Sequence, residues 1–455
     1  MTDIERVHER IDQTWESDFL ILKDLIAQQS VSTENRGVRE CSVYIRDLLE
    51  SFGVSATVYE TDGFPLVYGE RQSRNHPDAP TILFYGHYDV MPAGDLAAWK
   101  TDPFTATIVD GVIYGRGVAD CKGQWIAHLI ALRAYLEVVG DIPVNLKFCF
   151  EGDEELGSPS IRKFVESHLE LLNADLVYTA DSGMHPSGRP YVLYGVRGNI
   201  SMDLSLRCAD KDNHSGHAGG VIREAVWEMI RVLASMYDEE GRVTIQGFYD
   251  DIVPPTEYDR HLIDLLPFDA KEYEEIFGIR EMELDRDAFF ERLMFRPTLS
   301  INGIHGGYTG PGPVTIIPGE VRVKMNMRLA HKQDPDKMFR NFEAHVHAVN
   351  PDVTVTWLAQ MPSSRTQTDL PIAMAVARAV KEVFGCEPVA MPLVGATGSK
   401  YIWTDILKQP SLIVPYANAD ENNHLPNENI TLACWRRGPH VSAQVYCELG
   451  KLKAE

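Results

Sequence analysis

The sequence predicts an α/β protein in which a sheet-based domain carries an inserted α+β domain. In residues 1–196, segments with helical periodicity alternate with short apolar runs, and several of these runs end in a histidine or a carboxylate. From 197 to 361 the order changes to long β segments with helices among them, and the first pattern resumes in 362–455. Alternating helices and strands favour a mostly parallel sheet, whereas a unit with its own strands and helices favours a second domain.

Length, charge and cysteine usage narrow the class of protein. At 455 residues the chain exceeds what one hydrophobic core usually serves, which agrees with two domains. The formal net charge is −23 and no basic patch is concentrated anywhere, which argues against a nucleic-acid partner. The chain has no apolar run of roughly 18 residues, no secretory pattern in residues 1–26 and no CxxC spacing among its seven cysteines. We therefore expect a cytoplasmic protein without a membrane partner.

The elements of the first domain follow from their apolar periodicity. Ser17–Gln29 and Val38–Phe52 repeat apolar residues at helical spacing and predict helices that cover a sheet. Thr81–Tyr85 is a β-favouring run that follows Pro80 and leads into HYDVMP. The other elements predicted in this domain are strands at 54–59, 144–150, 174–180 and 411–415, a hairpin around Asp110-Gly111, helices at 122–139, 161–172 and 370–384, and a last helix.

The insert has a different order of elements. A long β segment at 191–207 leads into it, a helix follows from about 221 to 237, and a proline-containing acidic loop lies at 250–267. Its second half is predicted as β segments at 298–304 and 319–329, a helix at 334–349 and a strand at 353–357.

Side chains that bind metals gather where the predicted strands end. The run 144–150 leads into EGDEE (151–155), Asp181 closes another strand, and His87 closes a third. In open α/β sheets, ligands bind beyond the carboxyl ends of the strands, so we expect these groups to face one crevice. Taken singly, each has a simpler interpretation: a solvated acidic turn, a hydrogen-bonded strand-end histidine or, for Asp120 before the helix at 122–139, a helix cap.

Six segments in this order resemble the aminoacylase and carnosine dipeptidase family of two-metal peptidases, which includes carboxypeptidase G and succinyl-diaminopimelate desuccinylase. They are HYDVMP, GRGVADCKG, EGDEELGS, the strand end at Asp181, DNHSG and NNHLPNE. The resemblance covers nearly the whole chain, and the long insert with GYTGPGPVTIIPG (307–319) is most similar to the cytosolic dipeptidase branch. It implies a discontinuous catalytic domain, 1–196 and 362–455, and an inserted domain, 197–361, that serves as a lid and forms a homodimer.

The resemblance also implies five ligands for two divalent metal ions, two imidazoles and three carboxylates: His87 and Asp181 for one ion, Glu155 and His424 for the other, and Asp120 as the bridge. Glu154 becomes the general base, and Asp89 orients His87, which its position two residues further on also allows. This donor set without a thiolate suits Zn²⁺ and tolerates Mn²⁺ or Co²⁺. The family also has a non-proline cis peptide after the bridging aspartate, here Asp120-Cys121.

Four further residues are candidates for contacts with the substrate. His214 in DNHSG resembles a lid histidine that stabilises the oxyanion, often in the partner subunit, although a locally bonded loop histidine is the simpler alternative. Arg328 resembles an arginine that holds the substrate carboxylate, and a surface ion pair is its alternative. The turn VGATGSK departs from the Gly-Gly-Ser form of the dipeptidases, and either Thr397 or Ser399 supplies a hydroxyl.

The preferred function is metal-dependent hydrolysis of the amide bond of a dipeptide or similar short peptide. In this hypothesis a metal-bridging water would attack the carbonyl, and Glu154 would take up its proton as general base. An N-acyl amino acid amidohydrolase is the nearest alternative, because it has the same metals and base with a different pocket. A non-catalytic metal-binding scaffold is a third hypothesis, which the complete ligand set and the presence of Glu154 disfavour.

Overall fold

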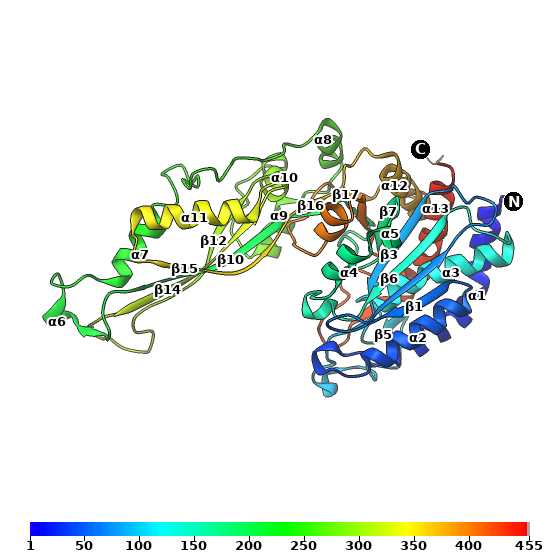
Figure 1. Ribbon diagram of the computed structural model, residues 1–455, viewed down its shortest axis with the longest axis horizontal. Helices are drawn as coiled ribbons and strands as arrows, with labels where there is room; N and C mark the ends of the chain where they lie inside the picture. Colours follow the sequence, from blue (N-terminus) through cyan, green and yellow to red (C-terminus); the bar gives the residue numbers. More distant parts are fainter. Residues whose placement is uncertain (453–455) are drawn as a thin grey trace.

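The computed structural model describes residues 1–452, and these form two bodies (Figure 1). The larger body is a sheet covered by helices and contains the N-terminus and the last helix, whereas the smaller one is an elongated arm built on a second sheet. This arrangement confirms the predicted α/β class.

The larger body is organised on an eight-stranded mixed sheet with the order β1-β2-β6-β3-β7-β18-β8-β17. Its central strands β6, β3, β7 and β18 run parallel, and β1 and β2 are antiparallel at one edge. The strands are β1 (Ser55–Tyr59), β2 (Leu66–Arg71), β3 (Thr81–His87), β6 (Asn145–Glu151), β7 (Leu176–Thr179), β8 (Tyr191–Leu193), β17 (Val389–Met391) and β18 (Ser411–Ile413). Parallel strands end at a common edge, which is where the predicted site lies.

Helices bury both faces of this sheet. Because side chains alternate along a strand, Ile82 and Phe84 of β3 pack into one core and Leu83 and Tyr85 into another. The first core is covered by α1 (Asp3–Ile26), α2 (Val38–Ser51), α3 (Lys122–Val138), α12 (Pro371–Phe384) and α13 (Leu432–Gly450). The second is covered by α4 (Ile161–Ser167), α5 (Leu169–Leu172) and a π-helical turn, Ile402–Ile406.

The first helix is longer than the predicted Ser17–Gln29. It begins at Asp3, because the Thr2 hydroxyl accepts a hydrogen bond from the Glu5 amide while the Glu5 carboxylate accepts one from the Thr2 amide. Val7 and Ile11 in the added turns are buried, so core contacts support the cap.

Smaller elements complete the larger body. The predicted hairpin is confirmed as β4 (Thr107–Val109) and β5 (Val112–Tyr114), with Asp110 and Gly111 in left-handed conformations at its turn. The strand β19 (Asn429–Thr431) pairs with β5, and β9 (Gly195–Val196) pairs with β16 (Ser364–Arg365) near the junction with the arm. Short 3₁₀ turns lie at Ser32–Glu34, Leu96–Ala98 and Glu154–Leu156.

The arm is built on a four-stranded antiparallel sheet with the order β12-β14-β10-β15. Its strands are β10 (Gly198–Arg207), β12 (Thr298–His305), β14 (Glu320–Leu329) and β15 (Thr354–Met361), and α7 (Ala225–Ala234) and α11 (Pro335–Val349) pack on one face. At the tip, β11 (Asn213–His214), α6 (Ser215–Ala218) and β13 (Ile316–Ile317) lie far from the larger body (Figure 1). These strands fall between 197 and 361, and the division into two independent domains stays a prediction.

Three helices inside the insert pack against the larger body. They are α8 (Glu257–Asp264), α9 (Ala270–Phe277) and α10 (Arg286–Phe295), and Ile263 and Phe290 form a core with Val389 of β17 and Leu393. The loop predicted at 250–267 is therefore wrong in part, because Thr256 begins a capped helix inside it. None of the helices in residues 1–452 combines the length and apolar character that a membrane span requires.

The central strand offers a test of this packing. Phe84 is 1% exposed and stacks on His128 with ring centroids 3.9 Å apart. Phe84→Ala should lower the free energy of unfolding by about 3–5 kcal/mol, because it leaves a cavity between the sheet and α3. Chemical denaturation measures the loss, and Leu20→Ala, at a side chain 61% exposed, is the control. Equal losses in the two variants would contradict the assignment of the core.

Candidate metal centre

Three neighbouring strands bring the predicted ligands to one edge of the sheet. His87 is the last residue of β3, Asp181 follows β7 by two residues, and the loop after β6 carries Glu154 and Glu155. Because β6, β3 and β7 are parallel neighbours, their carboxyl ends meet at this edge. Two loops from elsewhere in the chain complete the cluster, with Asp120 before α3 and His424 before β19.

The spacing of the donor atoms fits metal coordination. His87 Nε2 lies 2.9 Å from Asp120 Oδ1 and 3.8 Å from Asp181 Oδ2. His424 Nε2 lies 3.0 Å from Asp120 Oδ2 and 3.1 Å from Glu155 Oε2. Ligand atoms of a tetrahedral Zn²⁺ site are about 3.3 Å apart, given metal–nitrogen distances of about 2.0–2.1 Å. Each Asp120 oxygen faces a different histidine, as a bridging carboxylate requires, so the cluster is a candidate site for two divalent ions.

The charges of the cluster are poorly balanced without a cation. Burial raises the pKa of Glu155 to about 8 and that of Asp181 to about 7, and in both cases the charge of Asp120 adds to the shift. Burial also opposes the ionisation of Asp120, but hydrogen bonds with His424 and His87 outweigh it and lower the pKa of that carboxyl. The contact with Asp120 raises the pKa of His424. Asp120 therefore holds most of the negative charge.

Asp89 fixes two parts of the site. The backbone carbonyl of this fully buried residue is 3.0 Å from His87 Nδ1, and its Oδ1 is 3.5 Å from the same nitrogen, so His87 turns Nε2 toward the cluster. The Asp89 carboxylate also accepts hydrogen bonds from the amides of Glu154, at 3.2 Å, and Glu155, at 3.1 Å. Only the first contact was expected from the sequence, because the second depends on how the β6 loop packs.

Glu154 differs from the predicted ligands around it. Within residues 1–452 it forms no ion pair with either histidine of the cluster, whereas Asp120 and Glu155 both do. Burial raises the pKa of Glu154, an effect that His87 opposes and that Asp120 and Asp89 reinforce. A carboxylate whose pKa is raised and that is not tied up in an ion pair is suited to accept and return a proton.

The peptide bond between Asp120 and Cys121 is cis, as the resemblance implied. The Cys121 sulfur accepts a hydrogen bond from the His87 amide at 3.4 Å and forms a close group with His87 and Asp181. Burial raises the pKa of Cys121 to about 12, so the group stays a thiol at neutral pH. Sequence reasoning missed this residue, although it directly follows Asp120.

Three other charged residues beside the cluster were also missed. Lys400 Nζ donates to Thr179 Oγ1 at 2.6 Å, and burial lowers the pKa of this lysine to about 7 although Asp181 opposes the shift. Burial raises the pKa of Glu421 to about 9, and Glu428 is fully buried. The sequence did hold a signal for these three residues, because they belong to segments that already carried candidate site residues. Lys400 ends the VGATGSK turn, and both glutamates belong to ENNHLPNE.

The structure joins two of the predicted substrate residues and separates a third. Arg328 of β14 donates to Thr397 Oγ1 at 2.5 Å, which connects the arm to the VGATGSK turn. The backbone carbonyl of Ser399 accepts a hydrogen bond from the Ile402 amide, just before the π-helical turn Ile402–Ile406. His214 is the N-cap of α6, which lies at the tip of the arm and far from the strands that carry the metal cluster (Figure 1), and its Nε2 is 3.1 Å from Thr315 Oγ1.

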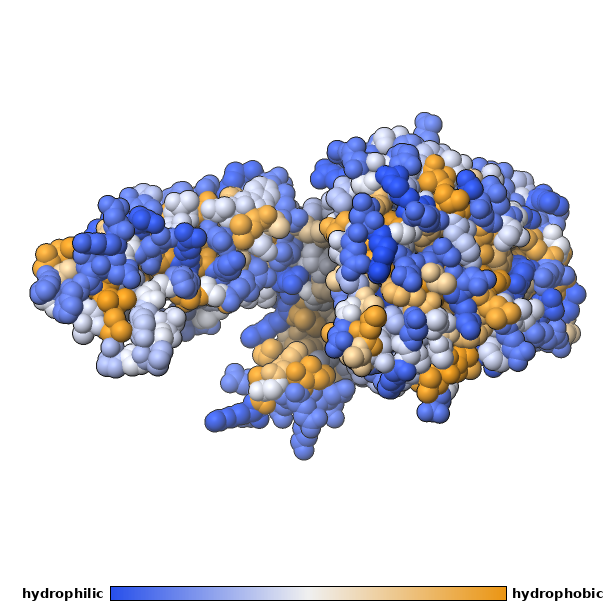
Figure 2. Space-filling view, turned by 90° about the horizontal axis from the view of Figure 1, so that it is seen from below, coloured by the Kyte–Doolittle hydropathy of each residue, from blue (hydrophilic) through white to orange (hydrophobic). Residues whose placement is uncertain are grey.

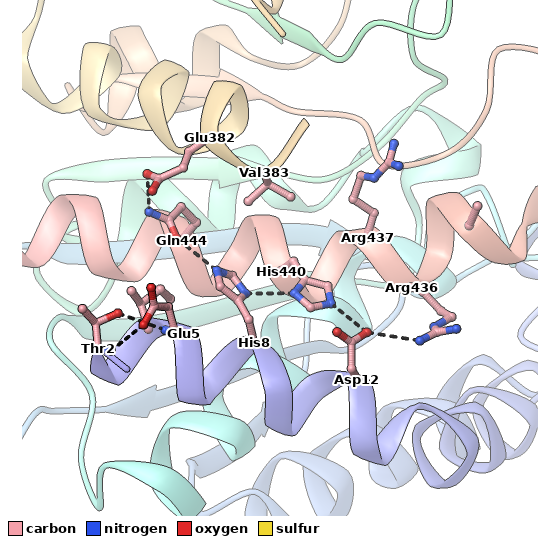
Figure 3. A pocket seen from close by; sticks show the side chains of 12 residues that line it. Thr2, Glu5, His8, Asp12, Glu382, Val383, Arg436, Arg437, His440 and Gln444 are labelled. Carbon is pink, nitrogen blue, oxygen red and sulfur yellow. Dashed lines mark hydrogen bonds and ion pairs between the residues drawn. The ribbon is translucent and has the colours of Figure 1, made fainter. Parts of the chain in front are cut away.

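A groove of about 680 Å³ lies away from these residues, between α1, α12 and α13 (Figure 3). Its polar side chains bond mainly to one another. His8 and His440 meet at 2.8 Å through their Nδ1 atoms, and Gln444 donates to Glu382 at 2.6 Å. None of the predicted site residues lines it. The view from below shows the arm projecting from the larger body (Figure 2).

Imidazoles and carboxylates gathered at the edge of a parallel sheet are the donors that a metallohydrolase needs. Residues 83–447 match the model of peptidase family M20/M25/M40, and the chain belongs to this family. It is a hydrolase that acts on peptide bonds. The family, the fold class and the type of enzyme predicted from the sequence are thus confirmed.

Three relatives illustrate the similarity. Beta-Ala-His dipeptidase of Mus musculus is 32% identical over 385 residues, which cover 82% of this chain and 78% of the relative. The solved structure of the M20 family metallo-carboxypeptidase Sso-CP2 from Sulfolobus solfataricus has a TM-score of 0.82 at 30% identity. The match covers 96% of this chain and 99% of the Sso-CP2 chain. The solved structure of human carnosine dipeptidase 1 has a TM-score of 0.76 at 28% identity, and the match covers 99% of this chain and 100% of that one.

The metal-free site should make stability fall as the pH rises. Asp181 and Glu155 have folded-state pKa values near 7 and 8, above their ordinary values, so the stability they contribute at acid pH is lost on approach to these values. The raised pKa values of His87 and His424 act in the same direction. The Tm of chelator-treated protein should therefore decrease from pH 5 to pH 8, and added Zn²⁺ should remove most of the decrease. Asp181→Asn should flatten the chelator curve; an unchanged slope in this variant would refute the assignment.

Proposed function

We propose that this protein is a two-metal dipeptidase that hydrolyses the amide bond of a dipeptide or a similar short peptide. The observation that carries the proposal is the position of Asp120, whose two oxygens lie 2.9 Å from His87 Nε2 and 3.0 Å from His424 Nε2. The names of the mouse and human relatives, beta-Ala-His dipeptidase and carnosine dipeptidase 1, support a dipeptide substrate. A cytoplasmic location belongs to the same proposal.

In this proposal His87 and Asp181 hold one metal ion, Glu155 and His424 hold the other, and Asp120 contributes to both. We propose Zn²⁺ as the ion, because it binds imidazole nitrogens and carboxylate oxygens. Mn²⁺ and Co²⁺ can also bind this set of donors. When bound, the ions supply Lewis-acid chemistry that polarises the scissile carbonyl and lowers the pKa of water.

The side chains around the ions have separate tasks. Glu154 accepts the proton of the attacking water and returns it to the leaving amine, for which its raised pKa is suited. Asp89 keeps the His87 ring and the amides of Glu154 and Glu155 in place. Arg328 holds the carboxylate end of the substrate through its guanidinium fork, with Thr397 or Ser399 as the accompanying hydroxyl.

The arm, residues 197–361, acts in this proposal as a lid and as the surface that forms a homodimer. His214 lies at the tip of the arm, at the opposite end from the larger body, so it reaches a catalytic centre only in a partner subunit (Figure 1). There it donates to the oxyanion that forms at the scissile carbon. Trp227 of α7 is 59% exposed and Val221 is 78% exposed, which supplies apolar surface for such a contact.

A carboxypeptidase is the second candidate function. The Sso-CP2 structure, which has a TM-score of 0.82, is that of a metallo-carboxypeptidase, and such an enzyme would use the same cluster on longer peptides. Hydrolysis of a panel of dipeptides, longer peptides and N-acyl amino acids by Zn²⁺-loaded protein separates these candidates. We expect the free dipeptides to be cleaved fastest; cleavage of N-acyl amino acids alone would replace the proposal by an amidohydrolase.

Two substitutions separate the base from the neighbouring ligand. Glu154→Gln should reduce kcat on the best dipeptide by about 10²–10⁴-fold, because it removes the general base. The zinc content of this variant should stay at two ions per chain. Glu155→Ala should lose zinc, because it removes a ligand. Activity assays and metal analysis of both purified variants measure the two effects. Comparable zinc loss in both variants would show that Glu154 is also a ligand.

A mixing experiment tests whether His214 acts across the dimer. His214→Ala and Glu154→Gln should each be nearly inactive as homodimers. After co-refolding or co-expression at equal amounts, half of the dimers pair the two chains, and each such dimer has one complete site. We therefore expect about one quarter of the wild-type activity to return. No gain over the separate variants, with hybrid dimers confirmed by differential tags, would show that His214 does not act in the partner.

A further inference from the structure

Two loops that are far apart in the sequence meet behind the metal cluster. The segment 115–121 carries Asp120, and the segment 421–428 carries His424. They are joined at their bases by the backbone pairing of β5 with β19 and by the Gly115 amide, which donates to the Glu428 carbonyl at 3.1 Å. Backbone pairing aligns the two segments and leaves the position of the Asp120 carboxylate to other contacts.

The side chain of Glu428 supplies these contacts. It is fully buried, and its Oε1 accepts hydrogen bonds from the amides of Gly117, at 2.9 Å, Ala119, at 2.9 Å, and Asp120, at 3.0 Å. Its Oε2 accepts from Arg116 Nη1 at 2.7 Å and from the Gly117 amide at 3.1 Å. A buried carboxylate is stable only when donors surround it, and here most of the donors belong to the loop that carries the bridging aspartate.

Arg116 extends the same network to the neighbouring loops. Its guanidinium is buried, and Nη2 donates to the carbonyl of Leu425, at 3.3 Å, directly after His424. The same nitrogen donates to the carbonyl of Pro92, at 3.1 Å, in the segment that follows His87. The ion pair of Arg116 and Glu428 therefore connects the three segments that carry His87, Asp120 and His424.

We propose that Glu428 is a positioning residue that sets the distance between Asp120 and His424 and thereby the affinity of the metal ion held by His424 and Glu155. The inference rests on the proposed two-metal function. His87 is fixed independently, because it ends a central strand and contacts Asp89. The side chain of His424, in contrast, is 48% exposed and belongs to a loop residue in the left-handed region. Its position depends more strongly on the network around Glu428.

The test compares metal binding in Glu428→Asp and Glu428→Gln with the wild type. Aspartate keeps the charge but is one methylene too short to reach both the Asp120 loop and Arg116. Glutamine keeps the length but turns an amide N–H group toward other donors. Zn²⁺ is titrated against a chromophoric chelator, and Tm and circular dichroism report folding. Glu448→Gln is the matched control, because Glu448 is also buried and ion-paired, with Arg378 at 3.3 Å, on α13.

We expect folded Glu428→Asp to bind one Zn²⁺ like the wild type and the second about 10–100 times more weakly, the range typical for contacts that support metal ligands. Glu448→Gln should bind both ions normally. Wild-type affinity for both ions in folded Glu428→Asp would overturn the inference, and so would equal weakening in Glu448→Gln. If Glu428→Gln does not fold, Glu428→Asp alone decides. A wild-type protein that binds fewer than two Zn²⁺ ions would instead refute the proposed function.

Discussion

The candidate metal centre depends on holding three carboxylates and two imidazoles within contact distance at one edge of a sheet, although the carboxylates repel one another when no cation is present. Two further carboxylates do this by accepting hydrogen bonds from the backbone. Asp89 accepts from the amides of Glu154 and Glu155, and Glu428 accepts from the loop that leads to Asp120. Two of the proposed ligands, Glu155 and Asp120, are therefore fixed through their backbone amides, and their side chains remain directed at the cluster. The raised pKa values of Glu155 and Asp181 show the electrostatic cost of this arrangement in the metal-free protein.

The two ends of the arm have different surroundings. The base of the arm is tied to the larger body, because Arg328 bonds to Thr397 and the helices α8 to α10 pack against the edge strand β17. The tip of the arm, which includes α6 and its N-cap His214, lies far from the larger body (Figure 1). A chain in which the base of the arm is anchored and the tip extends away is suited to completing the site of a second molecule, which is the reason for proposing catalysis across a homodimer.

Much of the fold and of the candidate site could be predicted from the sequence, and the rest depends on packing. Strongly periodic or well-bounded segments such as 38–52, 81–85 and 334–349 were predicted within a few residues, because their burial follows directly from their patterns. The start of α1 and the helix α8 were missed, because both segments are rich in charged residues. Hydrogen bonds of their capping boxes nevertheless stabilise these helix starts. The motif order placed all five proposed ligands in one cluster. It did not indicate Cys121, Lys400 or Glu428, whose surroundings come from segments that are far apart in the chain.

Anomalous diffraction from a Zn²⁺-loaded crystal, recorded on both sides of the zinc absorption edge, would test the central claim most directly. We expect two peaks about 3.5–4 Å apart, one beside His87 and Asp181 and the other beside Glu155 and His424, with the Asp120 carboxylate between them. A single peak, or two peaks that do not share Asp120, would contradict the central claim.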